Sequence, residues 1–247
     1  MHIFGDLAKW FGDAAHWHGS SGVPARTLQH VELSSVSVAL AAAVSLPVGM
    51  LIGHTRRGEF LAVTVANFGR AIPSFAILSI VFQLMLNYTP SLAFGFGPTV
   101  VALWLLAIPP VLTNTYVGVQ GVDADTVEAA RGMGLSGAQV LRRLELPLAA
   151  PLILAGLRTA AVQVVATATL AALIGGGGLG RFIIDGFHTG DDTQIVAGAV
   201  LVAGLAIATE LLMGALERAV SPRVSSTGRA PRAESVVPPR PPDLISV

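Results

Sequence analysis

Five long stretches of mostly apolar residues constrain this chain more than any other feature of its sequence. A helix that crosses a membrane needs about 20 mostly apolar residues, because the hydrocarbon core is about 30 Å thick and each residue adds about 1.5 Å. Inside lipid the backbone must satisfy its own hydrogen bonds, so such stretches are expected to be helical. The sequence therefore predicts an all-α integral membrane protein with about five transmembrane helices, at residues 31–53, 61–86, 98–117, 148–174 and 195–216.

The second stretch differs from the others, because polar residues and a proline interrupt it. Asn67 and Arg70 make its first half polar, and Pro73 follows. This first half is expected either to cross the membrane with the second half or to form a slanted segment at the interface.

Charge is scarce in the chain, which agrees with a membrane protein. Charged residues make up 12% of the sequence, against about 25% in a typical soluble domain. The 15 basic and 15 acidic residues cancel, so nothing suggests a nucleic-acid partner. The single lysine, Lys9, follows no glycine-rich turn, whereas a Walker A loop needs a lysine there. If ATP is used, another chain must bind it. The chain has no cysteine, and its six histidines lack metal-ligand spacing, so no metal site is expected.

Basic residues gather in alternate loops, and this pattern orients the predicted bundle. Arg56 and Arg57 follow the first stretch, and Arg142 and Arg143 lie between the third and fourth. Because cytoplasmic loops carry the excess of basic residues, we expect the N-terminus outside and the C-terminus inside. The tail at residues 219–247 is rich in Pro, Ser and Arg and is predicted to be a disordered cytoplasmic segment.

Residues 1–25 are predicted to form an external leader. Its Trp10 and Trp17 either lie at the membrane interface, where aromatic side chains concentrate, or belong to a loosely ordered segment.

The basic loop at residues 123–147 carries the signs of two short helices. Asp125 and Glu128 have the spacing of a capping box, and Gly132 and Gly134 can end the helix that starts there. Ser136 begins a second box, whose partner is Gln139. The second helix is expected to stop near residue 145, because Pro147 biases Leu146 away from helix.

These two helices would present an apolar surface to the cytoplasm. Such a surface either receives a partner or packs on the chain's own bundle. Its residues are Ala129, Ala130, Met133, Leu135, Leu141 and Leu144.

The same loop resembles the EAA loop of the permease subunits of bacterial ABC importers. The resemblance lies in Glu128-Ala-Ala, Gly134 and Leu144-Glu-Leu-Pro147, at the family's spacing over twenty residues, with leucine at 144 where the consensus has isoleucine. In that family the loop forms coupling helices that dock into a groove of the ATPase subunit. The resemblance implies a type I importer permease of the methionine-importer-like kind, with a permease domain over residues 26–218. It assigns ATPase coupling to Glu128, Ala129, Ala130, Gly132, Met133, Gly134, Leu144 and Pro147.

The resemblance also implies the partners of the chain. They are a second permease copy or paralogue, a dimer of ABC ATPases, an external solute-binding protein and the lipid bilayer. ATP and Mg²⁺ would be bound by the ATPase, so this chain would be a non-catalytic subunit without a cofactor.

Further segments are similar to the osmoprotectant permeases, which import glycine betaine, carnitine, choline or proline. They are residues 70–74, 108–116, 153–158 and 166–174, the last followed by the glycine-rich residues 175–180. These substrates imply a zwitterion or a quaternary ammonium compound, and aromatic side chains bind such cationic groups through cation–π contacts. Phe68, Phe75, Phe82, Trp104 and Tyr116 are the candidates, and core packing explains the same residues.

Polar residues inside the apolar stretches are expected to face a path or to hold helices together. Arg158 and Glu210 either pair within the bundle or are satisfied separately, by snorkelling and by backbone hydrogen bonds. The glycine-rich run 175–180 lacks the strand that a dinucleotide site needs, so it is predicted to be a flexible turn or a half-buried external loop. The translocation path is predicted to include Arg70, Pro73, Ser74, Pro109, Thr113, Asn114, Tyr116, Gln163 and Thr167.

An ATP-independent secondary transporter or channel is the alternative function. It would favour inverted repeats and ion sites at the membrane midplane, and the sequence shows neither. A membrane enzyme is a third class, for which the sequence offers no catalytic constellation.

Overall fold

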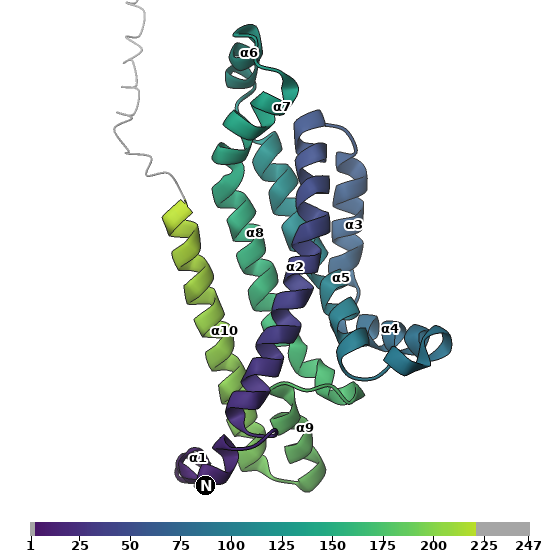
Figure 1. Ribbon diagram of the computed structural model, residues 1–247, viewed down its shortest axis with the longest axis vertical. Helices are drawn as coiled ribbons and strands as arrows, with labels where there is room; N and C mark the ends of the chain where they lie inside the picture. Colours follow the sequence, from purple (N-terminus) through teal and green to yellow (C-terminus); the bar gives the residue numbers. More distant parts are fainter. Residues whose placement is uncertain (1–2, 221–247) are drawn as a thin grey trace, which may run out of the picture.

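The structure, a computed structural model, describes residues 3–220 of the chain, except for the side chains of Ile3, Leu61, Val65 and Arg70. Every regular element within that range is helical (Figure 1). The predicted tail lies outside the described residues from position 221 onward.

Four helical runs in the described range are long and apolar enough to cross a membrane. They are α2 (Val23–Thr55), α5 (Phe96–Gln120), a run from Gly137 to Ile174, and α10 (Asp192–Val220). The third run is built from α7 (Gly137–Val140), the π-helical turn η3 (Leu141–Glu145), α8 (Leu146–Thr167) and the 3₁₀ segment η4 (Ala168–Ile174). These runs contain the predicted stretches 31–53, 98–117, 148–174 and 195–216.

The remaining predicted stretch, 61–86, is a broken pair of helices. α3 (Glu59–Ala71) and α4 (Ser74–Tyr88) meet at an angle of 94°. Pro73 cannot donate a backbone hydrogen bond, and Ile72 before it is extended at φ −80° and ψ 125°. The structure thus places a sharp turn between the two halves of the predicted stretch, at Ile72 and Pro73. α3 runs beside α5, and α4 turns across the end of α3 (Figure 1). α3 can approach α5 closely because Ala62 and Ala66 are buried and small.

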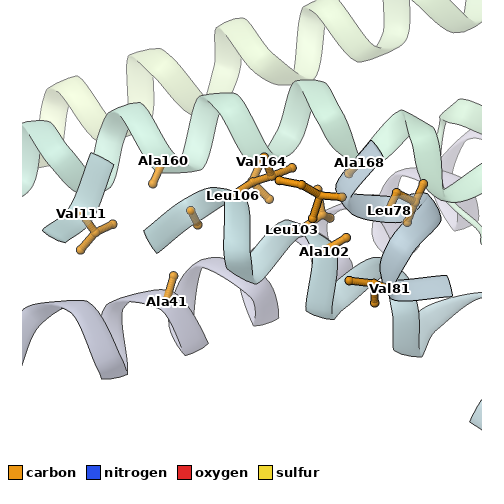
Figure 2. Packing of buried hydrophobic residues seen from close by; sticks show 12 residues of the cluster. Ala41, Leu78, Val81, Ala102, Leu103, Leu106, Val111, Ala160, Val164 and Ala168 are labelled. Atoms are coloured by element: carbon orange, nitrogen blue, oxygen red, sulfur yellow. The ribbon is translucent and has the colours of Figure 1, made fainter. Parts of the chain in front are cut away.

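Helix α5 lies at the centre of the bundle, between α2, α3, α4 and α8. Its Leu103, Leu106 and Val111 are buried against small side chains, including Ala41 of α2 and Ala160 of α8 (Figure 2). Helices in lipid approach one another closely where such small residues face each other. Glycines extend the pattern, because a Cβ at Gly49 would lie 2.7 Å from Cβ of Thr115.

The end of the bundle that includes the N-terminus is covered by short helices. α1 (Ile3–Gly12) packs on α10, and η1 (Ala14–Trp17) follows it. Trp10 is buried among Val23, Leu179, Phe182 and Ala197, so the prediction of a loosely ordered leader is wrong for this helix. Two more short elements are α9 (Gly180–Thr189) and η2 (Pro90–Leu92).

Candidate functional site

The loop between α5 and α8 stands at the end of the bundle opposite α1 and α9 (Figure 1). Its first helix, α6 (Ala124–Gly132), is capped by Asp123 and not by the predicted Asp125. The backbone N–H of Thr126 donates to Oδ2 of Asp123 at 3.0 Å, and the Thr126 hydroxyl donates to the same oxygen at 2.8 Å. These bonds hold the pKa of Asp123 below its usual value. Asp125 instead lies in the first turn, where its charge complements the helix dipole.

The end of α6 and the start of α7 agree with the sequence prediction. Gly134 has φ +87°, and the N–H of Leu135 donates to the carbonyl of Ala130 across the turn at 3.2 Å. The second capping box places the N–H of Ser136 2.8 Å from Oε1 of Gln139.

The chain does not leave the helix before Pro147, and that prediction is wrong. Leu146 has helical angles of −63° and −46°, and its N–H donates to the carbonyl of Leu141, five residues earlier. A π-helical turn is wider than an α-helical turn. The wider turn makes room for the proline ring, which would otherwise meet the carbonyl four residues before it. The loop is thus joined to α8 by continuous helix.

The loop has an apolar core of its own and an exposed outer face. Val122, Val127, Ala130 and Val140 are buried together, with Leu135 and Leu144 packed against them. Of the residues assigned to coupling, Ala130 and Leu144 therefore serve the loop's own packing. The exposed residues assigned to coupling are Glu128, Ala129, Gly132, Met133, Gly134 and Pro147. Met133 is 76% exposed, which is unusual for a large apolar side chain.

A partly buried polar contact ties this loop to helix α2. Nδ1 of His54, in the last turn of α2, lies 2.5 Å from Oε2 of Glu145 in the π-helical turn. Glu145 is only 4% exposed. The sequence alone did not point to either residue, because no local spacing relates positions 91 residues apart.

The sequence also matches a known family. Residues 45–226 match the family of binding-protein-dependent transport system inner membrane components. The chain belongs to this family. Its curated relatives are permease proteins of transport systems, and the chain is a permease of that kind.

Three curated relatives show how far the similarity extends. The choline transport system permease protein OpuBB of Bacillus subtilis (strain 168) is 36% identical, over 80% of this permease and 88% of the relative. The glycine betaine/carnitine/choline transport system permease protein OpuCB of the same strain is 35% identical over the same shares. The carnitine transport permease protein OpuCB of Listeria monocytogenes is 36% identical, over 83% and 90%.

Solved structures share the fold of the permease. A chain of the inward-facing MetNI methionine ABC transporter has a TM-score of 0.70 at 22% identity, covering 79% of the permease and 94% of that chain. A chain of an amino acid ABC transporter with histidines has a TM-score of 0.66 at 19% identity, covering 80% and 93%.

The structure does not bring the residues predicted to line a path together in one place. Pro109 and Tyr116 are buried, Pro109 beside Gly69 of α3 and Tyr116 beside Ala62 of the same helix. Asn114 donates to the carbonyl of Pro110 at 2.8 Å. These three residues thus support helix structure and packing.

Other predicted path residues lie nearer the surface. Ser74 and Thr167 line a shared hollow between α4, α5 and the end of α8, and Gln163 is exposed on α8. Thr113 is half-buried, and its hydroxyl has no hydrogen-bond partner within the described range. Pro73 is exposed at the start of α4. The side chain of Arg70 lies outside the described part of the chain.

The aromatic candidates are separated in the same way. Phe82 packs edge-to-face on Phe94 at 5.4 Å. Trp104 and Tyr116 belong to different hydrophobic clusters. Core packing therefore accounts for Trp104 and Tyr116. Phe82 packs on the exposed Phe94 near the surface, and Phe68 and Phe75 are exposed.

Arg158 and Glu210 pair between α8 and α10, as one of the two sequence hypotheses proposed. Nε of Arg158 donates to Oε1 of Glu210 at 2.9 Å, and Nη1 donates to Oε2 of Glu217 at 2.9 Å. Glu217 was missed, although it lies seven residues after Glu210 and so on the same helix face.

The glycine-rich run after η4 is half-buried and closely packed, so the flexible-turn alternative is wrong. A Cβ at Gly180 would lie 2.2 Å from the carbonyl oxygen of Thr169. The N–H of Leu179 donates to Nδ1 of the fully buried His30 at 3.2 Å. Gln29, beside it on α2, accepts from the N–H of Gly178 at 3.1 Å. Gln29 and His30, in the first turns of α2, therefore hold the glycine-rich run in place.

Proposed function

We propose that this permease is the membrane-spanning subunit of an ATP-driven importer for compatible solutes. The solutes are of the kind that the relatives' names state: glycine betaine, carnitine and choline. The observation that carries the proposal is the exposed outer face of the α6–α7 loop, where Glu128 and Ala129 match the family's coupling motif and the apolar Met133 is exposed beside them. The permease would bind neither ATP nor Mg²⁺, which belong to the partner ATPase dimer.

The distribution of charge supports an orientation with this loop in the cytoplasm. The loop between α2 and α3, which contains Arg56 and Arg57, lies at the same end of the bundle as α6 and α7 (Figure 1). Arg131, Arg142 and Arg143 belong to the α6–α7 loop itself. Basic residues favour the cytoplasmic side. The N-terminus would then lie outside and the C-terminus inside.

We assign the path to the surface of α8 that carries polar side chains. Thr159, Gln163 and Thr167 are spaced by four residues and share one face, and the first two are exposed. Polar side chains exposed at membrane depth are costly against lipid. A second permease copy or paralogue facing this surface would enclose a polar passage, into which an external binding protein delivers the solute.

Co-purification from membranes tests the coupling role. An ATPase is expected to co-purify with the wild type and to be lost with Met133→Asp, which puts a charge on the exposed apolar contact. Phe4→Asp is the matched control, because Phe4 is an exposed apolar side chain (86%, against 76% for Met133) at the other end of the bundle. Loss of the ATPase from both variants, or from neither, would contradict the assignment.

Uptake of labelled glycine betaine, carnitine and choline tests the transport role. Uptake is expected to stop when ATP is depleted while the membrane potential is held constant. Uptake that persists would point to the ATP-independent transporter instead.

A further inference from the structure

A polar cavity lies at the end of the bundle opposite the coupling loop. Its volume is about 490 Å³, and it is bounded by the first turns of α2, the start of α5, the glycine-rich run and α9. That volume is in the range of small-molecule sites. The wall is preformed, because Gln29 and His30 hold the glycine run against α2. A Cβ at Gly177 would lie 2.3 Å from Oε1 of Gln29, so a larger residue there would displace the Gln29 side chain from the wall.

The side chains in this cavity carry charges of both signs. Arg26, Glu32 and Arg181 line it together with the half-exposed ring of Phe96. Arg181 is already paired with Asp185 at 2.5 Å. Arg26 donates one hydrogen bond to Oε1 of Gln29, at 3.1 Å. A guanidinium has five N–H donors, so four remain for a ligand. The side chain of Glu32 is exposed, and it makes no hydrogen bond or ion pair with another residue in the described range. The cavity thus offers one cation, one anion and one aromatic face to a ligand.

We propose that this cavity binds a small zwitterion, with Arg26 holding its carboxylate and Glu32 and Phe96 facing its quaternary ammonium group. A guanidinium binds a carboxylate through charge-assisted hydrogen bonds. An ammonium that bears methyl groups has no N–H to donate, so a carboxylate and an aromatic face are the partners that suit it. The inference rests on the proposed function, and it adds a site on the permease itself to whatever selectivity the binding protein has.

The geometry separates two classes among the proposed solutes. Glycine betaine and carnitine carry both charged groups, whereas choline has a hydroxyl and no carboxylate. Choline therefore lacks the contact with Arg26. Because choline loses this charge-assisted hydrogen bond, it should bind at least about tenfold more weakly.

A fluorescent side chain in the cavity can report binding without the external binding protein. Phe96→Trp keeps an aromatic face and is introduced into the permease purified with its ATPase. Glycine betaine is expected to change its fluorescence saturably, and choline to half-saturate the change at about tenfold higher concentration. Adding Arg26→Gln should raise the half-saturation for glycine betaine about tenfold and leave that for choline unchanged. Adding Glu32→Gln should weaken both.

Two controls distinguish solute binding in the cavity from a nonspecific response and from protein docking. Phe4→Trp places the same reporter at the same end of the bundle but outside the cavity, on a side chain that is 86% exposed. An equal response there would overturn the proposal. So would a response of Phe96→Trp to the binding protein alone, because the cavity would then be a docking surface for a protein.

The test also separates this inference from the proposed function. If wild-type cells import none of the three solutes, the proposed function fails. If they import glycine betaine while Phe96→Trp gives no response to it in a complex that elutes intact, only the cavity assignment fails.

Discussion

Gly134 and Gly132 differ at the level of a single backbone angle. Gly134 has φ +87°, in the left-handed region that is unfavourable for residues with a Cβ. Gly132 lies within the last turn of α6. An added Cβ would meet nothing within 4 Å at either position. Any difference between alanine substitutions therefore comes from backbone conformation and not from contacts.

We expect Gly134→Ala to destabilise the α6–α7 turn by about 1 kcal/mol, the usual cost of a left-handed conformation for a residue with a Cβ. Gly132→Ala should be neutral or slightly stabilising, since alanine favours helix over glycine. Hydrogen exchange of the α6 amides measures both variants. Equal exchange rates in the two variants would show that the backbone angle does not matter.

Two elements far apart in sequence meet where the coupling loop touches α2. The His54–Glu145 contact joins the end of α2 to the π-helical turn that continues into α8. A glutamate that is 4% exposed must keep a partner, because an unpaired buried carboxylate is costly.

Glu145→Ala is expected to cost about 2 kcal/mol by leaving His54 without its partner. Glu145→Gln should cost less, because an amide can still hydrogen-bond the imidazole. A double-mutant cycle with His54→Ala, followed by thermal unfolding, is expected to give a coupling energy of about 1 kcal/mol or more. Additive effects would mean that the contact does not link the two elements.

Helix α10 is held to α8 by an ion cluster whose centre is Arg158. Two glutamates of α10, Glu210 and Glu217, converge on this one guanidinium. Arg158→Glu is therefore expected to abolish assembly by placing three carboxylates together. Exchanging the charges with Arg158→Glu and Glu210→Arg should restore part of the amount of intact permease. The amount of intact permease in membranes is the measurement, and failure of the exchange in a protein that still inserts would argue against direct pairing.

The elements of this fold differ in how far the sequence predicted them. Apolar length was enough for α2, α5, α8 and α10, because crossing lipid imposes both helix and length. Local signals predicted the turn at Gly134 and the helix cap at Ser136. They predicted Asp125 and not Asp123 as the cap of α6, because two aspartates two residues apart offer the same capping chemistry. The angle between α3 and α4 depends on packing against α5, which no local pattern contains. The same holds for His54, Glu145 and Glu217, whose roles arise only when distant helices meet.

On the scale of the whole molecule, the two ends of the bundle present opposite faces for the proposed transport cycle. The coupling loop with Met133 occupies one end, and the helix that bears Lys9 occupies the other (Figure 1). The sequence contains no cysteine, so a single introduced thiol can be followed without interference.

Met133→Cys is expected to react with a membrane-impermeant thiol reagent only after the cytoplasmic side is opened. Lys9→Cys should react in intact cells, because the proposed orientation places the N-terminus outside. The reverse pattern would invert the topology, and uptake of labelled solute by both variants shows that they remain functional.

Helix α2 carries the proposed solute cavity on its first turns and the contact to the coupling loop on its last. Arg26 and His54 are 28 residues apart on one continuous helix, which corresponds to about 42 Å at the α-helical rise. Pro47 removes one backbone hydrogen bond near the His54 end, but the helix continues through it and can act as a lever. A tilt of about 5° displaces one end by about 4 Å relative to the other, so a small rotation imposed at the cytoplasmic end would be felt as an ångström-scale opening or closing of the cavity wall on the far side.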